Sequence, residues 1–233
     1  MGTSTFAERL SQIQDEVAEA AHRVGRATED ITLIGVSKRK PVEDMQQAYN
    51  VGLRDFGENR AQEVRDKFPG FNPDGIVRHF IGHLQSNKVK YLPGRVDIIH
   101  TIDSTRIADA VDQRFGGQDL CIPVLVEINI SGEANKEGVE PAQAMELAAY
   151  CAEKPNLQFQ GLMTIGPLTS DAARIRRAFR EMMLLSEQVV KQVGTSGKTA
   201  ILSMGMSSDF KIAIEEGATH LRVGTALFGA REY

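Results

Sequence analysis

The sequence predicts an α/β protein, a single (β/α)8 TIM barrel preceded by one extra helix. Short apolar runs alternate repeatedly with helix-like stretches, which is the pattern of a parallel sheet with crossover helices. Several runs are β-branched on both faces, as in Val124–Ile130, which indicates strands covered by helices. The length of 233 residues is close to the roughly 250 that such barrels use. An open doubly wound sheet is the competing fold, but no GxGxxG motif follows an expected strand.

The leading helix is indicated by apolar residues at steps of three and four from Phe6 to Val24. Thr5 and Glu8 match a capping box, and Gly25 suits the helix end. Strands are expected at the apolar runs Ile31–Val36, Leu53–Phe56, Val77–Ile81, Asp97–Ile102, Leu120–Ile130, Leu157–Met163, Thr199–Ser203 and His220–Val223. Helices are expected near 42–50, 59–67, 86–92, 105–114, 141–152, 171–192 and 208–216. No linker or repeat divides the chain, so residues 1–233 are expected to form one domain.

Composition and charge exclude several classes of protein. Lys and Arg number 27 against 31 Asp and Glu, a net charge of −4, which argues against a general nucleic-acid binder. No window approaches the ~20 apolar residues of a membrane span, and the first residues lack the features of a signal peptide. Cys121 and Cys151 are expected to be buried thiols in a reducing compartment. We therefore expect a cytoplasmic protein and, because no strongly apolar outer patch stands out, a monomer.

Chemistry in such a barrel belongs at the C-terminal ends of the strands. Lys38 follows the first strand, and a lysine there could form a Schiff base with a carbonyl compound. The loops after strands seven and eight, which contain Ser207 and Gly224, are where these barrels often bind phosphate. Ser207 or Ser208 is expected to cap the following helix. We expect Lys38 and the phosphate site to face each other across the mouth, so that one phosphorylated aldehyde satisfies both.

Other catalytic signatures are missing from the sequence. It contains no HExxH, GxSxG or P-loop pattern. His79 and His83 are four residues apart but lie on a strand and its loop, so they form no helical metal-binding face. The sequence therefore predicts no metal site. His220 is expected in or just before the last strand, as a core or edge residue.

Motifs at the ends of the expected strands together resemble one family. They are Val36–Lys38, Phe56–Asn59, His79–Gly82, Leu84–Lys88, His100–Asp103, Gly161–Met163, Met204–Ser207 and Arg222–Thr225. The chain is identified by them as a member of the pyridoxal phosphate homeostasis protein family, also called proline synthetase co-transcribed homologues. The fold of that family resembles the N-terminal barrel of alanine racemase, and the resemblance covers essentially the whole chain.

The resemblance implies a cofactor, pyridoxal 5′-phosphate (PLP), bound to Lys38 as an aldimine. Ser207, Gly224 and Thr225 would hold its phosphate, and Arg222 would approach its pyridine nitrogen. A permanently charged arginine there would make the ring a weak electron sink. Asn59 and Met163 would complete the list of pocket residues: Lys38, Asn59, Met163, Ser207, Arg222, Gly224 and Thr225.

Three functions remain open from the sequence. The first is a non-catalytic binder that holds PLP in vitamin B6 and amino-acid homeostasis, with PLP-dependent apo-enzymes as candidate transient recipients. The second is a PLP-dependent amino-acid racemase, which needs a second base opposite the lysine. The alanine racemases supply a tyrosine from an additional domain, and none of Tyr49, Tyr91, Tyr150 and Tyr233 is expected at the mouth. The third is a phosphosugar isomerase or aldolase that uses Lys38.

Overall fold

The computed structural model describes residues 5–133, 135–197 and 199–229. Within these ranges eight parallel strands pair in chain order, and β1 also pairs with β8 to close the barrel. The strands are β1 Thr32–Val36, β2 Asp55–Glu58, β3 Val77–Phe80, β4 Ile98–Ile102, β5 Ile122–Ile128, β6 Leu157–Thr164, β7 Ile201–Met206 and β8 His220–Val223. The predicted (β/α)8 barrel is confirmed, with every expected strand present.

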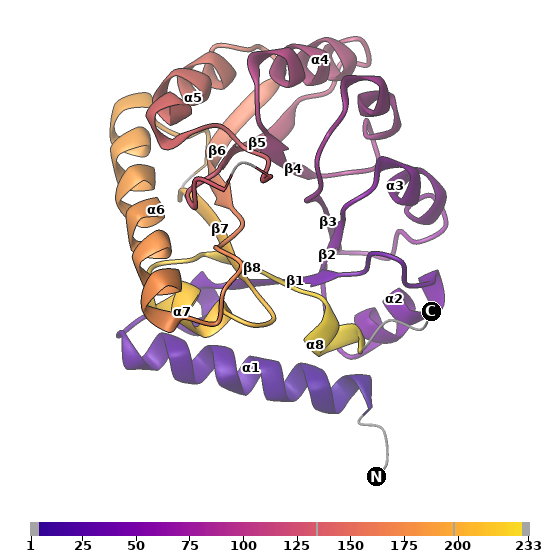
Figure 1. Ribbon diagram of the computed structural model, residues 1–233. Coiled ribbons are helices and arrows are strands. Elements are labelled where there is room, and N and C mark those ends of the chain that lie inside the picture. The colour runs from indigo at the N-terminus through magenta and orange to yellow at the C-terminus, as the bar shows by residue number, and fades with distance from the viewer. Residues whose placement is uncertain (1–4, 134, 198, 230–233) are drawn as a thin grey trace.

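Helices surround the barrel, as Figure 1 shows in a view into it. They are α1 Phe6–Arg23, α2 Val42–Asn50, α3 Ala61–Lys67, α4 Thr105–Gly116, α5 Ala144–Ala152, α6 Ala172–Val193, α7 Phe210–Glu215 and α8 Thr225–Phe228. Short 3-10 helices lie at η1 Thr28–Asp30, η2 Ser86–Tyr91 and η3 Pro141–Gln143. None of the helices in the described ranges is long and apolar enough to cross a bilayer.

The extra N-terminal helix α1 packs beneath α7 and α8 (Figure 1). Its predicted capping box is confirmed: Thr5 Oγ1 accepts from the Glu8 N–H, and the Glu8 carboxylate accepts from the Thr5 N–H. Phe6 lies edge-on to Phe228, with ring centroids 5.3 Å apart. The helix therefore covers the elements that carry the loops after β7 and β8.

Several sequence predictions were wrong in detail. The segment near 86–92 is a 3-10 helix rather than an α-helix, and β5 is shorter than Leu120–Ile130. Cys151 is buried as expected, but Cys121 is exposed, because it lies just before the first residue of β5. The short helix α8 was not predicted, since four residues are too few for a periodic pattern.

The buried apolar side chains form two separate clusters. The large core lies between the outer faces of the strands and the helices, with fully buried aromatic residues such as Phe56, Phe159 and Phe179. A second, small apolar cluster consists of Ile98, Leu125 and Met163. Because alternate residues of a strand point to opposite faces, Leu125 of β5 lies on the face opposite to its core-facing neighbours, inside the barrel.

A β-bulge interrupts the middle of β6. Phe159 and Gly161 pair with consecutive residues of β5, so Gln160 is the extra residue. Gly161 has φ +145°, and a Cβ atom there would lie 2.0 Å from the carbonyl oxygen of Ile201. Only glycine permits this close approach between β6 and β7.

Candidate binding site at the barrel mouth

A cavity of about 470 Å³ opens at the C-terminal ends of the strands. Six of the predicted site residues, all within the described ranges, line it: Lys38, Asn59, Ser207, Arg222, Gly224 and Thr225. Met163 is placed differently, since it is fully buried with Ile98 and Leu125 inside the barrel. Glu127 and Glu137, which the sequence analysis did not single out, also line the cavity, together with His83, which it considered only with His79 as a metal-binding pair.

Lys38 lies in the turn after β1, next to a buried polar cluster. The Ser37 hydroxyl donates to Glu58 Oε1 over 2.7 Å, and both side chains are fully buried. Lys67 Nζ donates to the same Glu58 oxygen over 2.8 Å and to the Ser37 carbonyl over 2.9 Å. These bonds tie the loop that carries Lys38 to β2 and α3.

A second carboxylate fixes the residue after Lys38. Arg39 has a positive φ of 60°, an uncommon conformation for a residue other than glycine. Its N–H donates to Glu63 over 2.7 Å, and Glu63 also pairs with Lys67 over 2.7 Å. Burial raises the pKa of Glu58 to about 7 despite the opposing effect of Lys67. Glu58 therefore stays close to its titration point at neutral pH while it supports the turn.

The loops after β7 and β8 meet on one side of the cavity. Ser207 Oγ lies 3.5 Å from the N–H of Ala226, in the first turn of α8. Gly224 precedes this helix, and Thr225 begins it, so their region presents N–H groups that have no partner within the helix. The residue at the N-cap of α7 is Asp209, rather than Ser207 or Ser208 as predicted, and it accepts from the Met206 N–H over 2.6 Å.

The lysine and the phosphate loops are adjacent rather than opposite across the mouth. Because β8 closes the barrel against β1, a Cβ atom on Gly224 would lie 3.4 Å from Cβ of Val36. Val36 is the last residue of β1 and precedes Lys38 by two positions. The expectation that they face each other across the mouth was wrong. The first and last strands are far apart in the sequence, but they are neighbours in the closed barrel.

Arg222 is a buried cation at the floor of the cavity, only 5% exposed. Its guanidinium donates to Ser203 Oγ over 2.6 Å and to the carbonyl of Thr164 over 2.8 Å. Burial lowers its pKa to about 10, and the charges of Glu127 and Asp209 oppose this shift. Arg222 is therefore protonated at neutral pH and held in one orientation by β6 and β7.

A chain of polar side chains continues from Arg222 through the barrel interior. Ser203 Oγ lies 3.0 Å from Nδ1 of His100, whose Nε2 lies 2.9 Å from Nδ1 of His79. His79 Nε2 lies 2.9 Å from the carboxylate of Asp55. Since β4 and β7 are not neighbours in the barrel, the contact between His100 and Ser203 must cross its interior. This chain fixes the hydroxyl that accepts from Arg222.

Two histidines of this interior, His100 and His220, favour the neutral form. Burial lowers the pKa of His100 well below its usual value, and nearby positive charge on His79, His220 and Arg222 adds to this. Burial likewise lowers the pKa of His220 to about 4. His220 begins β8, as predicted, and its ring centroid lies 6.3 Å from those of His79 and His100. His100 and His220 are therefore neutral at neutral pH, beside the protonated Arg222.

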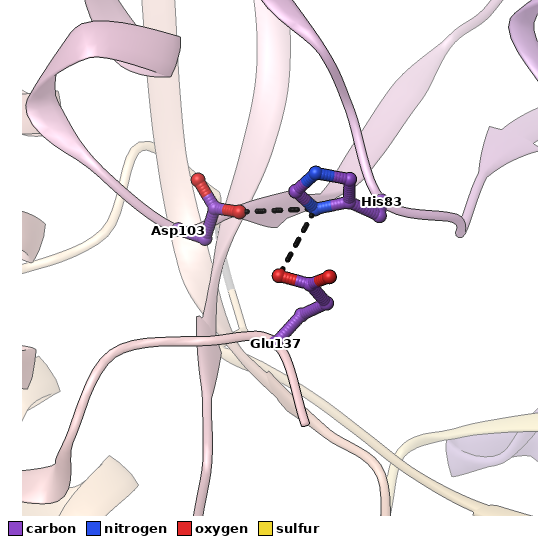
Figure 2. Close-up of side chains that lie close together, drawn as sticks. All are labelled: His83, Asp103 and Glu137. Carbon is purple, nitrogen blue, oxygen red and sulfur yellow. Dashed lines mark ion pairs between the residues drawn. The ribbon is translucent and has the colours of Figure 1, made fainter. Parts of the chain in front are cut away.

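The opposite side of the cavity carries carboxylates. Figure 2 shows the carboxylates of Asp103 and Glu137 directed at the same ring nitrogen of His83. One oxygen of each lies 3.3 Å from this nitrogen, Nδ1. Glu127 is 4% exposed, and its Oε2 has no hydrogen-bond partner in the described part of the chain. Burial, followed by the charges of Asp103 and Glu137, raises the pKa of Glu127 to about 7.

Asn59 also presents an unsatisfied acceptor at the cavity. Its buried Oδ1 has no hydrogen-bond partner among the described residues. Gly82 lies so close to it that a Cβ atom would be 2.0 Å from the Asn59 carbonyl oxygen. Buried polar atoms are normally paired, so the free oxygens of Asn59 and Glu127 mark places where a ligand could supply a donor.

Comparison with protein families matches residues 9–232 to the family model described as alanine racemase, N-terminal domain. A curated relative from Aquifex aeolicus, named pyridoxal phosphate homeostasis protein, is 42% identical over 226 residues, covering 97% of this chain and 98% of the relative. A relative of the same name from Escherichia coli strain K12 is 40% identical over 231 residues, covering 98% and 97%.

Solved structures show the same fold. PipY of Synechococcus elongatus, determined without PLP and with PLP bound, superposes with TM-scores of 0.85 and 0.83 at 32% and 31% identity. Each superposition covers 97% of this chain and 100% of PipY.

Proposed function

Because the chain belongs to the pyridoxal phosphate homeostasis protein family, built on the alanine racemase N-terminal domain, we propose that it binds pyridoxal 5′-phosphate at the barrel mouth. Lys38 is the residue that would attach to the aldehyde carbon. Ser207, Gly224 and Thr225 would bind the phosphate, and Arg222 would donate toward the pyridine nitrogen. In this role the protein holds the cofactor for intracellular vitamin B6 and amino-acid homeostasis.

One observation carries the proposal: a lysine, the loops after β7 and β8, and a buried arginine line the same cavity. Its volume of about 470 Å³ is within the usual range of small-molecule sites, roughly 300–1,000 Å³. The unpaired Oδ1 of Asn59 offers an acceptor to a hydroxyl of the ligand. The donor set thus fits a compact molecule that carries a phosphate, a carbonyl group and a ring nitrogen.

The same residues favour holding the cofactor over catalysis with it. Bound PLP supplies an electron-withdrawing ring, which is strong when the ring nitrogen is protonated. Arg222 is protonated and held in place by its hydrogen bonds to Ser203 and Thr164, and a guanidinium is too weak an acid to transfer its proton to the ring nitrogen. This arrangement supports a carrier with little intrinsic catalytic power.

The positions of the tyrosines also favour a carrier over a racemase. Among those in the described ranges, Tyr49 donates to the carbonyl of Asp74 and Tyr150 donates to Asp109. The ring of Tyr91 contacts the ammonium groups of Lys88 and Lys90. Tyr233 lies outside the described residues. None of Tyr49, Tyr91 and Tyr150 lines the cavity. None of these three could therefore serve as the tyrosine base that a racemase needs.

The proposal also covers the oligomeric state of the protein and its location in the cell. Few large apolar residues are exposed in the described ranges, namely Val24, Val51, Val77, Ile165, Leu168 and Leu184, which supports a monomer that meets recipient apo-enzymes transiently. The exposed thiol of Cys121 is free, which is typical of a reducing compartment such as the cytoplasm.

The test is a titration of the PLP-free chain with PLP, followed by visible absorbance, and a parallel titration with pyridoxal, which lacks the phosphate. We expect a saturable absorbance change with PLP, at least about tenfold weaker binding of pyridoxal because charge-assisted bonds are lost, and no covalent signal for Lys38→Ala. The control variant Lys40→Ala should behave as the wild type. Equal affinity for PLP and pyridoxal would contradict the phosphate site, and an unchanged signal in Lys38→Ala would contradict the lysine.

A further inference from the structure

Three potential metal ligands converge at the rim of the cavity from distant parts of the sequence. His83 follows β3, Asp103 follows β4, and Glu137 belongs to the loop after β5. One ligand atom of each lies within 4.8 Å of the others. His83 and Glu137 also line the cavity. Figure 2 shows the two carboxylates directed at the imidazole from different sides.

The distances within this group suit a shared cation better than direct pairing. Asp103 Oδ2 and Glu137 Oε2 each lie 3.3 Å from Nδ1 of His83. A hydrogen bond between an imidazolium and a carboxylate is shorter, about 2.7–2.9 Å, and Nδ1 carries a single proton for two acceptors. Ligands at about 2.0–2.1 Å from a tetrahedral zinc ion lie roughly 3.3–3.4 Å apart. The two contacts of Nδ1 therefore match the edges of a tetrahedral site.

A second observation points to a cation in the same place. The side chain of Glu127 is buried at the cavity, and its Oε2 has no hydrogen-bond partner within the described ranges. Its charge adds to those of Asp103 and Glu137, both of which act on it. A buried acceptor beside two further carboxylates favours a positive group. The charge of Arg222 acts on Glu127, but the hydrogen bonds of Arg222 go to Ser203 and Thr164 and leave Oε2 of Glu127 unpaired within the described residues.

We propose that His83, Asp103 and Glu137 bind a divalent transition-metal ion of the zinc class at the rim of the cavity. One nitrogen and two carboxylate oxygens form a borderline ligand set, which favours zinc over magnesium or calcium. The three protein ligands leave a fourth position open. Because His83 and Glu137 line the cavity, an oxygen donor that enters the cavity can occupy that position.

This site was not foreseen in the sequence, which predicted no metal. The ligands are 20 and 34 positions apart, as 103 − 83 and 137 − 103 show, so they form no local motif. Asp103 is held within the site by its own loop, where it accepts from the Ser104 hydroxyl over 3.0 Å. Glu137 is the most exposed ligand, with 56% of its side chain accessible, and can adjust to close the third edge.

The experiment measures zinc binding to the full-length, PLP-free chain by competition with a chromophoric chelator. A Cys121→Ser background removes the exposed thiol, which could bind zinc by itself. The test variants are His83→Gln, Asp103→Asn and Glu137→Gln, and the control is His22→Gln, an exposed histidine on α1. Glu137 is exposed, so its variant addresses the proposal even if the Asp103 variant folds poorly.

We expect one zinc ion per chain, at least about tenfold weaker binding in Glu137→Gln and in His83→Gln, and unchanged binding in His22→Gln. Millimolar magnesium should not displace the ion. The absence of one-to-one binding, or equal affinity in the wild type and the Glu137 variant, would overturn the proposal and leave His83 in direct contact with the two carboxylates. Since no PLP is present, this result is independent of the proposed cofactor function.

Discussion

The two sides of the barrel mouth are built from opposite charges. Along β7, β8 and β1 the cavity presents Lys38, Arg222 and the start of α8. Along β3 to β5 it presents Glu127, Glu137 and the rim around His83. The net charge of −4 conceals this division, because it averages over the whole surface. The cavity therefore suits a ligand with an anionic end and a cationic or donor end.

The two sides also differ in how well their charges are satisfied. Arg222 donates to Ser203 and Thr164, and the interior histidines hold Ser203 in place. Glu127 Oε2, by contrast, has no partner in the part of the chain that the structure describes. The basic side is therefore organised in advance, whereas the acidic side depends on a proton, a cation or a ligand.

Removal of the buried cation should give the largest effect on the fold. In Arg222→Leu the buried carboxylates of Glu127 and Asp209 lose the positive charge that acts on both, and Ser203 and Thr164 lose their donor. Leaving buried charge uncompensated costs about 3–5 kcal/mol. Urea unfolding monitored by circular dichroism measures this loss. Arg222→Lys, which keeps the charge, should lose less. If the leucine variant were as stable as the wild type, the basic side would not be the organised half of the mouth.

The pH dependence of Glu127→Gln tests the acidic side. The pKa of Glu127 is raised from 4.5 to about 7 in the folded chain, so the folded state binds the proton more tightly than the unfolded state. The contribution of Glu127 to stability is therefore present below pH 4.5 and is lost as pH rises to about 7, a change of about 3 kcal/mol. Glu127→Gln should gain on the wild type by this amount across that range.

Urea unfolding of both proteins between pH 4.5 and 8, in the presence of EDTA, measures the difference. Glu58 has a pKa raised to a similar value, but it is present in both proteins and cancels. A difference in unfolding free energy that stays constant with pH would mean that Glu127 ionises normally and that the acidic side is well solvated.

Much of the barrel could be predicted because each strand is a short β-branched or apolar run. The site could be located from the strand ends, and Lys38, Asn59, Ser207, Arg222, Gly224 and Thr225 do line one cavity. Met163 lies inside the barrel with Ile98 and Leu125 rather than along the cavity. The extra residue Gln160 turns the side chain of Met163 inward, which no local pattern reveals.

The supporting residues were harder to find from sequence. Ser37, Glu58 and Lys67 meet through tertiary contacts between β1, β2 and α3, and the interior chain of His79 and His100 joins strands that are apart in sequence. The available signal was the presence of polar residues within otherwise apolar strands. Such interruptions indicate an inward-facing polar position, but they do not identify its partner.

The most direct test of the central claim is to add PLP to the protein, reduce it with borohydride and map the modified peptide by mass spectrometry. If the basic side of the mouth holds the cofactor, a phosphopyridoxyl group will be found on the peptide that contains Lys38. A phosphopyridoxyl group on a different lysine, or no modification after incubation with PLP, would contradict the account.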